Sequence, residues 1–338
     1  MAITVALGGD TMLGRGVAER IAASGPYGLF ADEVRRTFRS ADLSLINLEC
    51  CISARGHPWP APGKPFHFRA PPRAVDTLTD LGIDGVTLAN NHALDYGHEA
   101  LTDTLAHLTH AGIRAVGAGP DLPRAREPAL FHLGDARVAV LGVTDHPSDF
   151  AAGDRPGVAY ADLRREVPAW LTDRIHALAA DGVLVLVLAH WGPNMTTEPL
   201  RYVRTAARAL VDAGATLVAG HSAHVFHGVG GRVLYDLGDL IDDYAVDPVL
   251  RNDLGLMFHV KLEGRRIARL TAVPLTLEYA RTRLATGADH AWIHKRFAAA
   301  CAAFGTTVTE EEDGRLAVAG PVPDEWPEGR PTAPPSTP

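Results

Sequence analysis

Six short stretches of the chain place a side chain that can bind a metal or carry a proton directly after a predicted strand. They are G-G-D-T-M (Gly8–Met12), N-L-E (Asn47–Glu49), A-N-N-H-A-L-D (Ala89–Asp95), A-H-W-G (Ala189–Gly192), G-H-S-A-H (Gly220–His224) and L-G-D (Leu237–Asp239). In parallel α/β sheets, ligands bind beyond the carboxyl ends of the strands. Carboxylate and amide oxygens, together with imidazole nitrogens, are the donors that divalent metals use. The ordered set therefore predicts a metal-dependent active site built from several loops.

Seven of these side chains are the expected metal ligands. They are Asp10, Glu49, Asn91, His190, His221, His224 and Asp239. Asp10 follows two glycines that leave its carboxylate unobstructed, although it could instead cap a following helix. A buried His190 at the end of a hydrophobic strand needs a hydrogen-bond partner or a metal. Asp239 is either a further ligand or a group that orients an imidazole. The donors do not select among Ca²⁺, Mn²⁺ and Zn²⁺, and no organic cofactor is expected.

Proton transfer is expected of His92, because an imidazole titrates near neutral pH. Asp95, three residues later, could orient this ring, and Asp10 could act beside it. The alternative for the motif is a turn of Asn residues with an exposed His. His294, in A-W-I-H-K-R-F, is either an exposed helical residue or a second proton carrier that folds back over the cleft.

Substrate contacts are expected from the proline-rich segment His57–Arg73, because long irregular loops are often functional. Lys64 and Arg69 lie in it, and the Arg69 guanidinium could hold an anionic substrate group through a two-pronged contact. A solvated surface charge is the alternative. Trp191, directly after the His190 strand, is expected to line the cleft.

The elements that must position these side chains alternate between strand and helix for most of the chain, which predicts an α/β fold. Buried strands are predicted at Ile3–Gly8, Leu43–Leu48, Gly85–Leu88, Arg137–Val143, Val183–Leu188, Thr216–Ala219 and Arg232–Tyr235, with a hairpin at Leu256–Leu262 and Arg266–Val273. Helices are predicted at Ala70–Leu81, Glu99–Ala111, Leu163–Ala180, Arg201–Ala213 and Ala291–Phe304.

Composition limits the class of protein. The 338 residues, 46% of them hydrophobic, can bury a large core. We expect one domain over residues 1–319 and a disordered Pro-rich tail over 320–338. The net charge of −8 argues against a nucleic-acid or anionic-membrane partner. The sequence shows neither a signal peptide nor a membrane-spanning run, which favours a cytoplasmic protein.

Cys50, Cys51 and Cys301 do not make a disulfide framework. Because Cys50 and Cys51 follow Glu49, one of them could be a catalytic thiol. Small packing residues are the favoured interpretation.

Taken together, the motifs resemble those of the CapA-type proteins of poly-γ-glutamate capsule synthesis. The matching segments cover roughly residues 2–275 and include G-D-T-M-L-G-R, I-N-L-E, K-P-F-H-F-R-A-P-P, A-N-N-H-A-L-D-Y-G, A-G-I-R-A-V-G-A-G, A-H-W-G, G-H-S-A-H-V and Y-D-L-G-D. The resemblance implies a calcineurin-like metallophosphoesterase fold, a four-layer αββα sandwich of two packed mixed sheets flanked by helices.

Three departures bear on the implied chemistry. Met12 stands where calcineurin-like phosphoesterases usually carry the His of Asp-x-His, and Glu49 stands where they usually carry Asp. A missing ligand disfavours hydrolysis between paired ions. Asp239 stands where CapA-type proteins often have Asn, and the added carboxylate favours proton transfer or an oxygen-preferring metal.

Three functions remain open. The chain resembles a cytoplasmic branch, the lasso-peptide epimerases, which implies a metal-dependent peptide epimerase that inverts the Cα of a C-terminal residue, expected to be tryptophan, in a precursor peptide. Inversion needs proton carriers on two faces and stabilisation of an enolate-like charge. The alternatives are a metal-dependent phosphoesterase and a non-catalytic subunit of a polymer-synthesis complex. The sequence does not indicate an oligomeric state.

Overall fold

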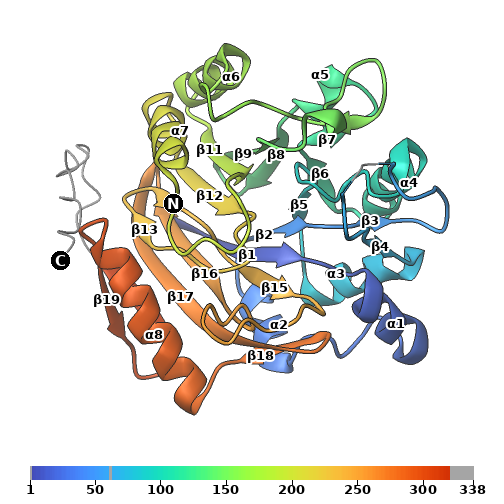
Figure 1. Cartoon of the computed structure of the whole chain (residues 1–338). Coiled ribbons are helices and arrows are strands. Elements are labelled where there is room, and N and C mark those ends of the chain that lie inside the picture. Colours follow the sequence, from blue (N-terminus) through green and yellow to red (C-terminus); the bar gives the residue numbers. More distant parts are fainter. Residues whose placement is uncertain (1, 61–62, 320–338) are drawn as a thin grey trace, which may run out of the picture.

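The structure is a computed structural model that describes residues 2–60 and 63–319. The segment 320–338, expected to be a disordered tail, lies outside the described residues. Two mixed β-sheets lie at the centre, and helices cover their outer faces (Figure 1).

The larger sheet has the strand order β19-β20-β17-β16-β1-β2-β5-β6, with β15 paired to β1 and β18 paired to β17. Strands β1, β2, β5 and β6 run parallel to one another, whereas β16 is antiparallel to β1. The strands are β1 (Ala2–Thr11), β2 (Leu43–Leu48), β5 (Gly85–Thr87), β6 (Arg114–Val116), β15 (Asp239–Ile241), β16 (Leu254–Glu263), β17 (Arg266–Glu278), β18 (Arg281–Leu284), β19 (Thr307–Glu310) and β20 (Leu316–Ala319).

The smaller sheet has the order β13-β14-β12-β11-β9-β8, and its β9, β11, β12 and β14 are parallel. Its strands are β8 (Ala129–Leu133), β9 (Ala136–Thr144), β11 (Leu184–His190), β12 (Leu217–His221), β13 (Val229–Gly230) and β14 (Val233–Leu234). Two further pairs are β3 (Cys51–Ile52) with β4 (Arg69–Ala70), and β7 (Ala118–Gly119) with β10 (Gly157–Val158).

The α-helices are α1 (Arg15–Ser24), α2 (Asp32–Arg39), α3 (Val75–Leu81), α4 (Gly97–His110), α5 (Leu122–Ala125), α6 (Ala169–Ala180), α7 (Arg201–Asp212) and α8 (Gly287–Ala302). Single 3₁₀ turns are η1 (Pro72–Ala74) and η2 (Ser148–Phe150). None of the described helices combines the length and apolarity that a membrane crossing requires. Helix α6 begins six residues after the predicted start because the chain enters it through an extended Pro168.

Three buried clusters define the layers. The middle cluster joins the two sheets, with Val5 of β1 facing residues such as Val140 of β9 and Leu186 of β11. A second packs α1 to α4 on the outer face of the larger sheet, and a third packs α6 and α7 on the outer face of the smaller one. Each fully buried Leu or Val contributes about 1.5–3 kcal/mol. The four-layer αββα sandwich expected of a calcineurin-like protein is confirmed.

Candidate metal centre

Strand register brings the predicted ligands together at one end of both sheets. In the larger sheet, Asp10 of β1 lies beside Asn47 of β2 and Asp239 of β15. In the smaller sheet, His190 of β11 lies beside His221 of β12. Because parallel strands end at the same edge, residues far apart in the sequence meet there.

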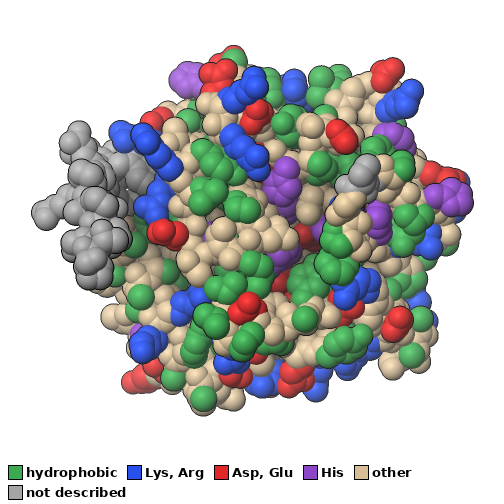
Figure 2. All heavy atoms as spheres, in the orientation of Figure 1, with side chains coloured by type: hydrophobic (Ala, Val, Ile, Leu, Met, Phe, Trp, Pro, Cys, Tyr) green, Lys and Arg blue, Asp and Glu red, His purple; other side chains and the backbone are tan. Residues whose placement is uncertain are grey.

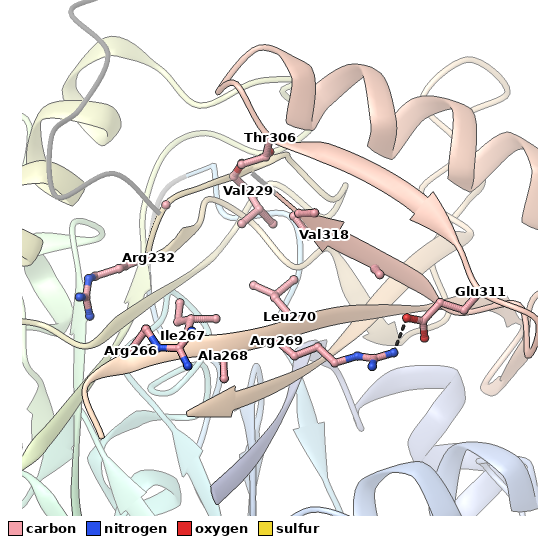
Figure 3. A pocket seen from close by; sticks show the side chains of 13 residues that line it. Val229, Arg232, Arg266, Ile267, Ala268, Arg269, Leu270, Thr306, Glu311 and Val318 are labelled. Carbon is pink, nitrogen blue, oxygen red and sulfur yellow. Dashed lines mark hydrogen bonds and ion pairs between the residues drawn. The ribbon is translucent and has the colours of Figure 1, made fainter. Parts of the chain in front are cut away.

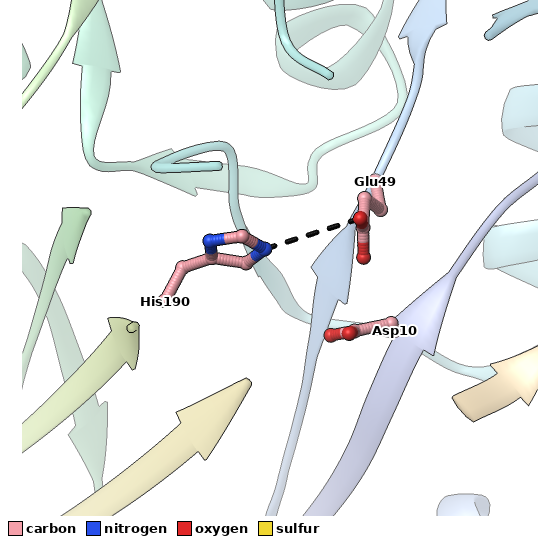
Figure 4. A group of neighbouring side chains, drawn as sticks. All are labelled: Asp10, Glu49 and His190. Carbon is pink, nitrogen blue, oxygen red and sulfur yellow. Dashed lines mark ion pairs between the residues drawn. The ribbon is translucent and has the colours of Figure 1, made fainter. Parts of the chain in front are cut away.

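A first donor group consists of Asp10, Glu49 and His190, which lie at the ends of β1, β2 and β11 and have ligand atoms within 4.8 Å of one another (Figure 4). His190 Nε2 lies 3.9 Å from Glu49 Oε1. All three side chains are buried. The group spans both sheets, so the packing of the sheets fixes its geometry.

A second donor group consists of Asp10, His224 and Asp239. His224 Nδ1 lies 2.9 Å from Asp239 Oδ1 and 3.5 Å from Asp10 Oδ2. The two groups share Asp10. Met12 is buried, its sulfur accepts the backbone N–H of Gly14, and it belongs to neither donor group.

Several buried oxygen and nitrogen atoms that could bind a metal have no hydrogen-bond partner among the described residues. They are Glu49 Oε1, Asn91 Oδ1, His190 Nε2, His221 Nε2 and Asp239 Oδ2. Buried polar atoms are normally paired, so their convergence calls for a bound group. Oxygen and imidazole donors of this kind fit a divalent metal ion.

The carboxylates are electrostatically frustrated without a cation. Burial, reinforced by the charge of Asp10, raises the pKa of Glu49 well above its ordinary value. Burial also raises the pKa of Asp239, although His224 opposes the shift. For Asp10, burial is outweighed by the hydrogen bond and charge of His221, so its pKa is lowered. A divalent cation would relieve the repulsion between these groups.

The histidines divide into two kinds. Burial and the neighbouring His146 lower the pKa of His190 well below its ordinary value, which favours the neutral imidazole that a metal requires. His224 shows the opposite shift: burial is outweighed by the charges of Asp239 and Glu49, and its pKa is raised.

His92 lies at the edge of the donor groups with its ring held on one side. Its Nδ1 lies 2.6 Å from Asp95 Oδ2, and its Nε2 lies 3.8 Å from Glu49 Oε1. Phe68 stacks on the ring at 4.1 Å between centroids. Burial, opposed by Asp95, lowers the pKa of His92 to about 4, so the ring is neutral at neutral pH.

Asn47 and Asn90 form a buried amide scaffold that was not predicted. Asn47 donates to Asp10 and Glu49, while Asn90 donates to Asn47 Oδ1 and accepts the backbone N–H of His92. Asn90 is therefore fully engaged. Asn91, next to it, keeps a free buried oxygen, as expected of a ligand.

A second histidine–carboxylate pair was also missed. His146 Nδ1 bonds to Asp145 Oδ1, and the His146 ring lies 4.9 Å from that of His190. Asp145 Oδ2 accepts the Tyr202 hydroxyl at 2.7 Å and the backbone N–H of Gly192. The signal was available, because Asp145-His146 follows the strand predicted at Arg137–Val143 just as the six motifs follow theirs.

Tyr244 is a further residue that the sequence reasoning missed. Its ring lies 5.3 Å from His224 and 5.9 Å from Phe68. Burial and the charge of Glu49 raise its pKa, which keeps the phenol protonated.

His294 and Arg69 make contacts other than those predicted, and Trp191 lines a pocket that contains none of the donor groups. His294 does not fold over the cleft: on α8, it faces Glu310 of β19 at 3.4 Å, because α8 covers the β16–β17 side of the core. Trp191 is buried beneath α7, where it lines a small pocket with Leu200 and Val203, and its Nε1–H donates to the Tyr235 carbonyl. Arg69 stacks on Tyr96 at 4.2 Å and donates to the 55–56 backbone.

Lys64 lies beside the acid/base pair. Its Nζ is 2.9 Å from Asp95 Oδ1 and donates to the Asn91 carbonyl. The structure thus places it as a positioning residue for Asp95, whereas the sequence predicted a substrate contact.

The cysteines are free thiols in buried positions, as expected. Burial raises the pKa of Cys50 to about 12 and raises that of Cys51 as well. A raised pKa keeps both thiols protonated at neutral pH. Because the thiolate is the reactive form of cysteine, neither residue is an activated nucleophile.

A cavity of about 730 Å³ lies away from these donors, between β17, β20 and the 229–232 segment (Figure 3). Arg269 reaches across its rim to Glu311. None of the predicted site residues is among its described lining residues.

By its fold and its donor groups, the chain is an αββα protein with a candidate metal-binding site at the ends of its parallel strands. The model of the family "Bacterial capsule synthesis protein PGA_cap" matches residues 4–244, and the chain belongs to this family. The resemblance to the CapA-type proteins is thereby confirmed.

Relatives match over most of the chain. A "Probable polyglutamine synthesis accessory protein" of Mycobacterium tuberculosis is 31% identical, covering 94% of this chain and 96% of its own. The "PGA biosynthesis protein CapA" of Bacillus subtilis is 29% identical over 79% of this chain and 70% of its own. Among solved structures, TT1561 of Thermus thermophilus is 13% identical, with a TM-score of 0.41 over 79% of this chain and 100% of its own.

Proposed function

We propose that the chain is a metal-dependent peptide epimerase, which removes a proton from one face of a peptide Cα and returns a proton to the other. One observation carries the proposal. Two histidine–carboxylate pairs, His92–Asp95 and His146–Asp145, adjoin the two partners of the Glu49–His190 contact: His92 Nε2 lies 3.8 Å from Glu49 Oε1, and the His146 ring lies 4.9 Å from that of His190. One pair follows β5 of the larger sheet and the other follows β9 of the smaller sheet.

The pairs have the same chemistry. In each, the carboxylate engages Nδ1, which leaves Nε2 to exchange a proton with substrate. His92, neutral at neutral pH, accepts the Cα proton as that C–H bond breaks. His146 then donates a proton from Nε2 to the opposite face as the new C–H bond forms. Exchange with solvent restores both rings. His146 thus replaces His294 as the second proton carrier.

The donor groups supply the remaining requirement. A divalent ion held by Asp10, Glu49 and His190 would provide positive charge beside the substrate carbonyl. The Asn47 amide donates to the carboxylates of Asp10 and Glu49. These two metal-type ligands are therefore held in place before the substrate binds. The name of the Mycobacterium tuberculosis relative, which refers to polyglutamine, supports a substrate made of amino-acid residues.

The test is incubation in D₂O with peptides that end in tryptophan, offered as L and D epimers, with Mn²⁺, Zn²⁺ or Ca²⁺ and a chelator control. Mass spectrometry follows deuterium at Cα, and chiral analysis follows inversion. We expect both in the wild type. The variants H92Q and H146Q should lose inversion by about 100-fold or more, each retaining exchange in one epimer only.

H132Q serves as a control, because His132 is exposed on β8. The absence of chelator-sensitive Cα exchange from every peptide would overturn the proposal. Equal loss in H132Q would show that the variants report on folding instead of proton transfer.

Phosphoester hydrolysis is a second candidate, favoured by the two donor groups that share Asp10. Paired ions on such groups can clamp a phosphoryl oxygen on either side. Release of p-nitrophenol from its phosphate with Mn²⁺, lost in H224Q and unaffected by H146Q, would select this candidate over epimerisation.

A further inference from the structure

A basic pocket lies beside the second histidine pair. It has a volume of about 650 Å³ and opens between the 163–167 segment and α7. Arg164, Arg165 and Arg201 line it, and Glu166 is the one carboxylate among its described lining residues. Figure 2 shows basic side chains over α6 and α7, on the face where histidines appear near the centre. This local charge contrasts with the net charge of −8.

Two of the three guanidinium groups are available to a ligand. Arg165 is exposed and paired with Asp162 at 3.1 Å. Arg164 engages the Tyr202 side chain and interacts at longer range with the charges of Asp145 and Asp162, but it makes no close ion pair among the described residues. Arg201 likewise forms no ion pair within the part of the chain that the structure describes.

The pocket is joined to the proposed active site through buried contacts. Tyr202 lines the pocket and donates its hydroxyl to Asp145 at 2.7 Å. Asp145 holds His146, whose ring lies 4.9 Å from that of His190. Occupancy of the pocket would therefore place a ligand next to the pair proposed to carry protons.

We propose that this pocket binds a carboxylate-bearing side chain of the peptide substrate, an inference that rests on the proposed function. The Arg164 and Arg201 guanidiniums match a carboxylate through paired N–H donors. Leu163, Val167 and Leu200 supply an apolar wall for the methylene groups that precede such a carboxylate. The pocket thus selects an acidic peptide.

The test measures binding without turnover. A tetramethylrhodamine-labelled hexaglutamate peptide and the matching hexaglutamine peptide are titrated with protein and followed by fluorescence anisotropy. We expect hexaglutamate to bind at least about ten-fold more tightly. The double variant R164Q/R201Q should weaken hexaglutamate binding by about ten-fold or more, since it removes the charged hydrogen bonds of both guanidiniums. R208Q is the matched control, because Arg208 lies on α7 outside the pocket and pairs with Asp212.

If R164Q/R201Q and R208Q weaken hexaglutamate binding equally, the peptide is attracted by the general surface charge, and the proposal that this pocket binds it is wrong. Similar binding of both peptides, or no binding of hexaglutamate, would overturn it as well. Displacement by inorganic phosphate but not by glutarate would overturn the carboxylate assignment. The D10N variant separates the two proposals: it should bind hexaglutamate normally. If wild type binds hexaglutamate through the arginines yet catalyses no Cα exchange, the pocket stands and the epimerase proposal fails.

Discussion

His92 and Asp95 are joined by a 2.6 Å contact between Nδ1 and Oδ2 within the turn that precedes α4. The same carboxylate accepts the Phe68 backbone N–H at 2.6 Å and pairs with Lys64 at 2.9 Å. Asp95 is therefore held from outside the turn, and it fixes the tautomer and direction of the His92 ring. The free Nε2 faces Glu49, on the side of the donor groups.

The first prediction concerns this contact. D95N keeps the shape of the side chain but removes its charge, so the His92 tautomer is no longer enforced. We expect Cα exchange to fall by about 10- to 100-fold, as is usual when a group that orients a catalytic histidine is lost. K64M should give a smaller loss. D173N on the exposed face of α6 is the control, and wild-type exchange rates in D95N would show that His92 acts without Asp95.

The second prediction concerns metal content. Because Asp239 completes a donor group with Asp10 and His224, we expect two equivalents of Mn²⁺ per chain in the wild type. D239N should bind about one. Its thermal stabilisation by Mn²⁺ should shrink, since a ligand present at 100 times its Kd contributes about 2.7 kcal/mol. Elemental analysis and thermal denaturation measure both quantities. If D239N still binds two equivalents of Mn²⁺ per chain, Asp239 is not a metal ligand and only orients the His224 ring.

Much of the fold was predictable because its strands are short, apolar and followed by polar residues. Leu43–Leu48 agrees with β2 at both ends, and the Leu256–Leu262 hairpin was found with shorter arms. Helices α1 and α2 were not predicted: α1 carries a glycine and α2 is mostly charged, so their apolar faces are narrow. Pairings such as β1 with β15 depend on tertiary packing that a local pattern does not encode.

The metal-type donors were predictable for a different reason, since each follows a strand that the pattern identifies. His294 shows what the pattern cannot predict. Helical spacing identifies the residues near His294 on α8, but it does not indicate against which strands α8 packs. Trp191 shows a related limit: a residue after a strand can turn inward as well as outward, and the pocket that Trp191 lines contains none of the donor groups. His146 was missed although it obeys the rule that found His190.

The third prediction concerns pH. Burial lowers the pKa of His227 to about 4, although the Thr196 carbonyl opposes the shift. The unfolded chain binds this proton at a pKa of about 6.5, so it holds more protons than the folded state between pH 6.5 and 4. Stability is therefore lost as the pH falls through that window, by about 2 kcal/mol at pH 5.

Urea unfolding of wild type and H227Q at pH 7 and pH 5 tests this sign. The wild type should lose about 2 kcal/mol more than H227Q between the two values, and titration of the other groups cancels in the difference. A wild type that loses no more than H227Q would mean that His227 is protonated in the folded state.

The fourth prediction concerns the backbone contact that holds the two donor groups together. A Cβ at Gly9 would lie 1.8 Å from the Gly238 carbonyl oxygen, which accepts the Asp10 N–H. G9A must push β15 away from β1, which separates Asp239 from Asp10. We expect a loss of about 1–3 kcal/mol in the free energy of unfolding, together with weaker Mn²⁺ binding. G153A is the matched control, because nothing lies within 4 Å of its Cβ, and its stability should change by less than about 0.5 kcal/mol. If G9A is destabilised but binds Mn²⁺ as wild type does, the donor groups tolerate the shift, and the β1–β15 pairing serves the fold alone.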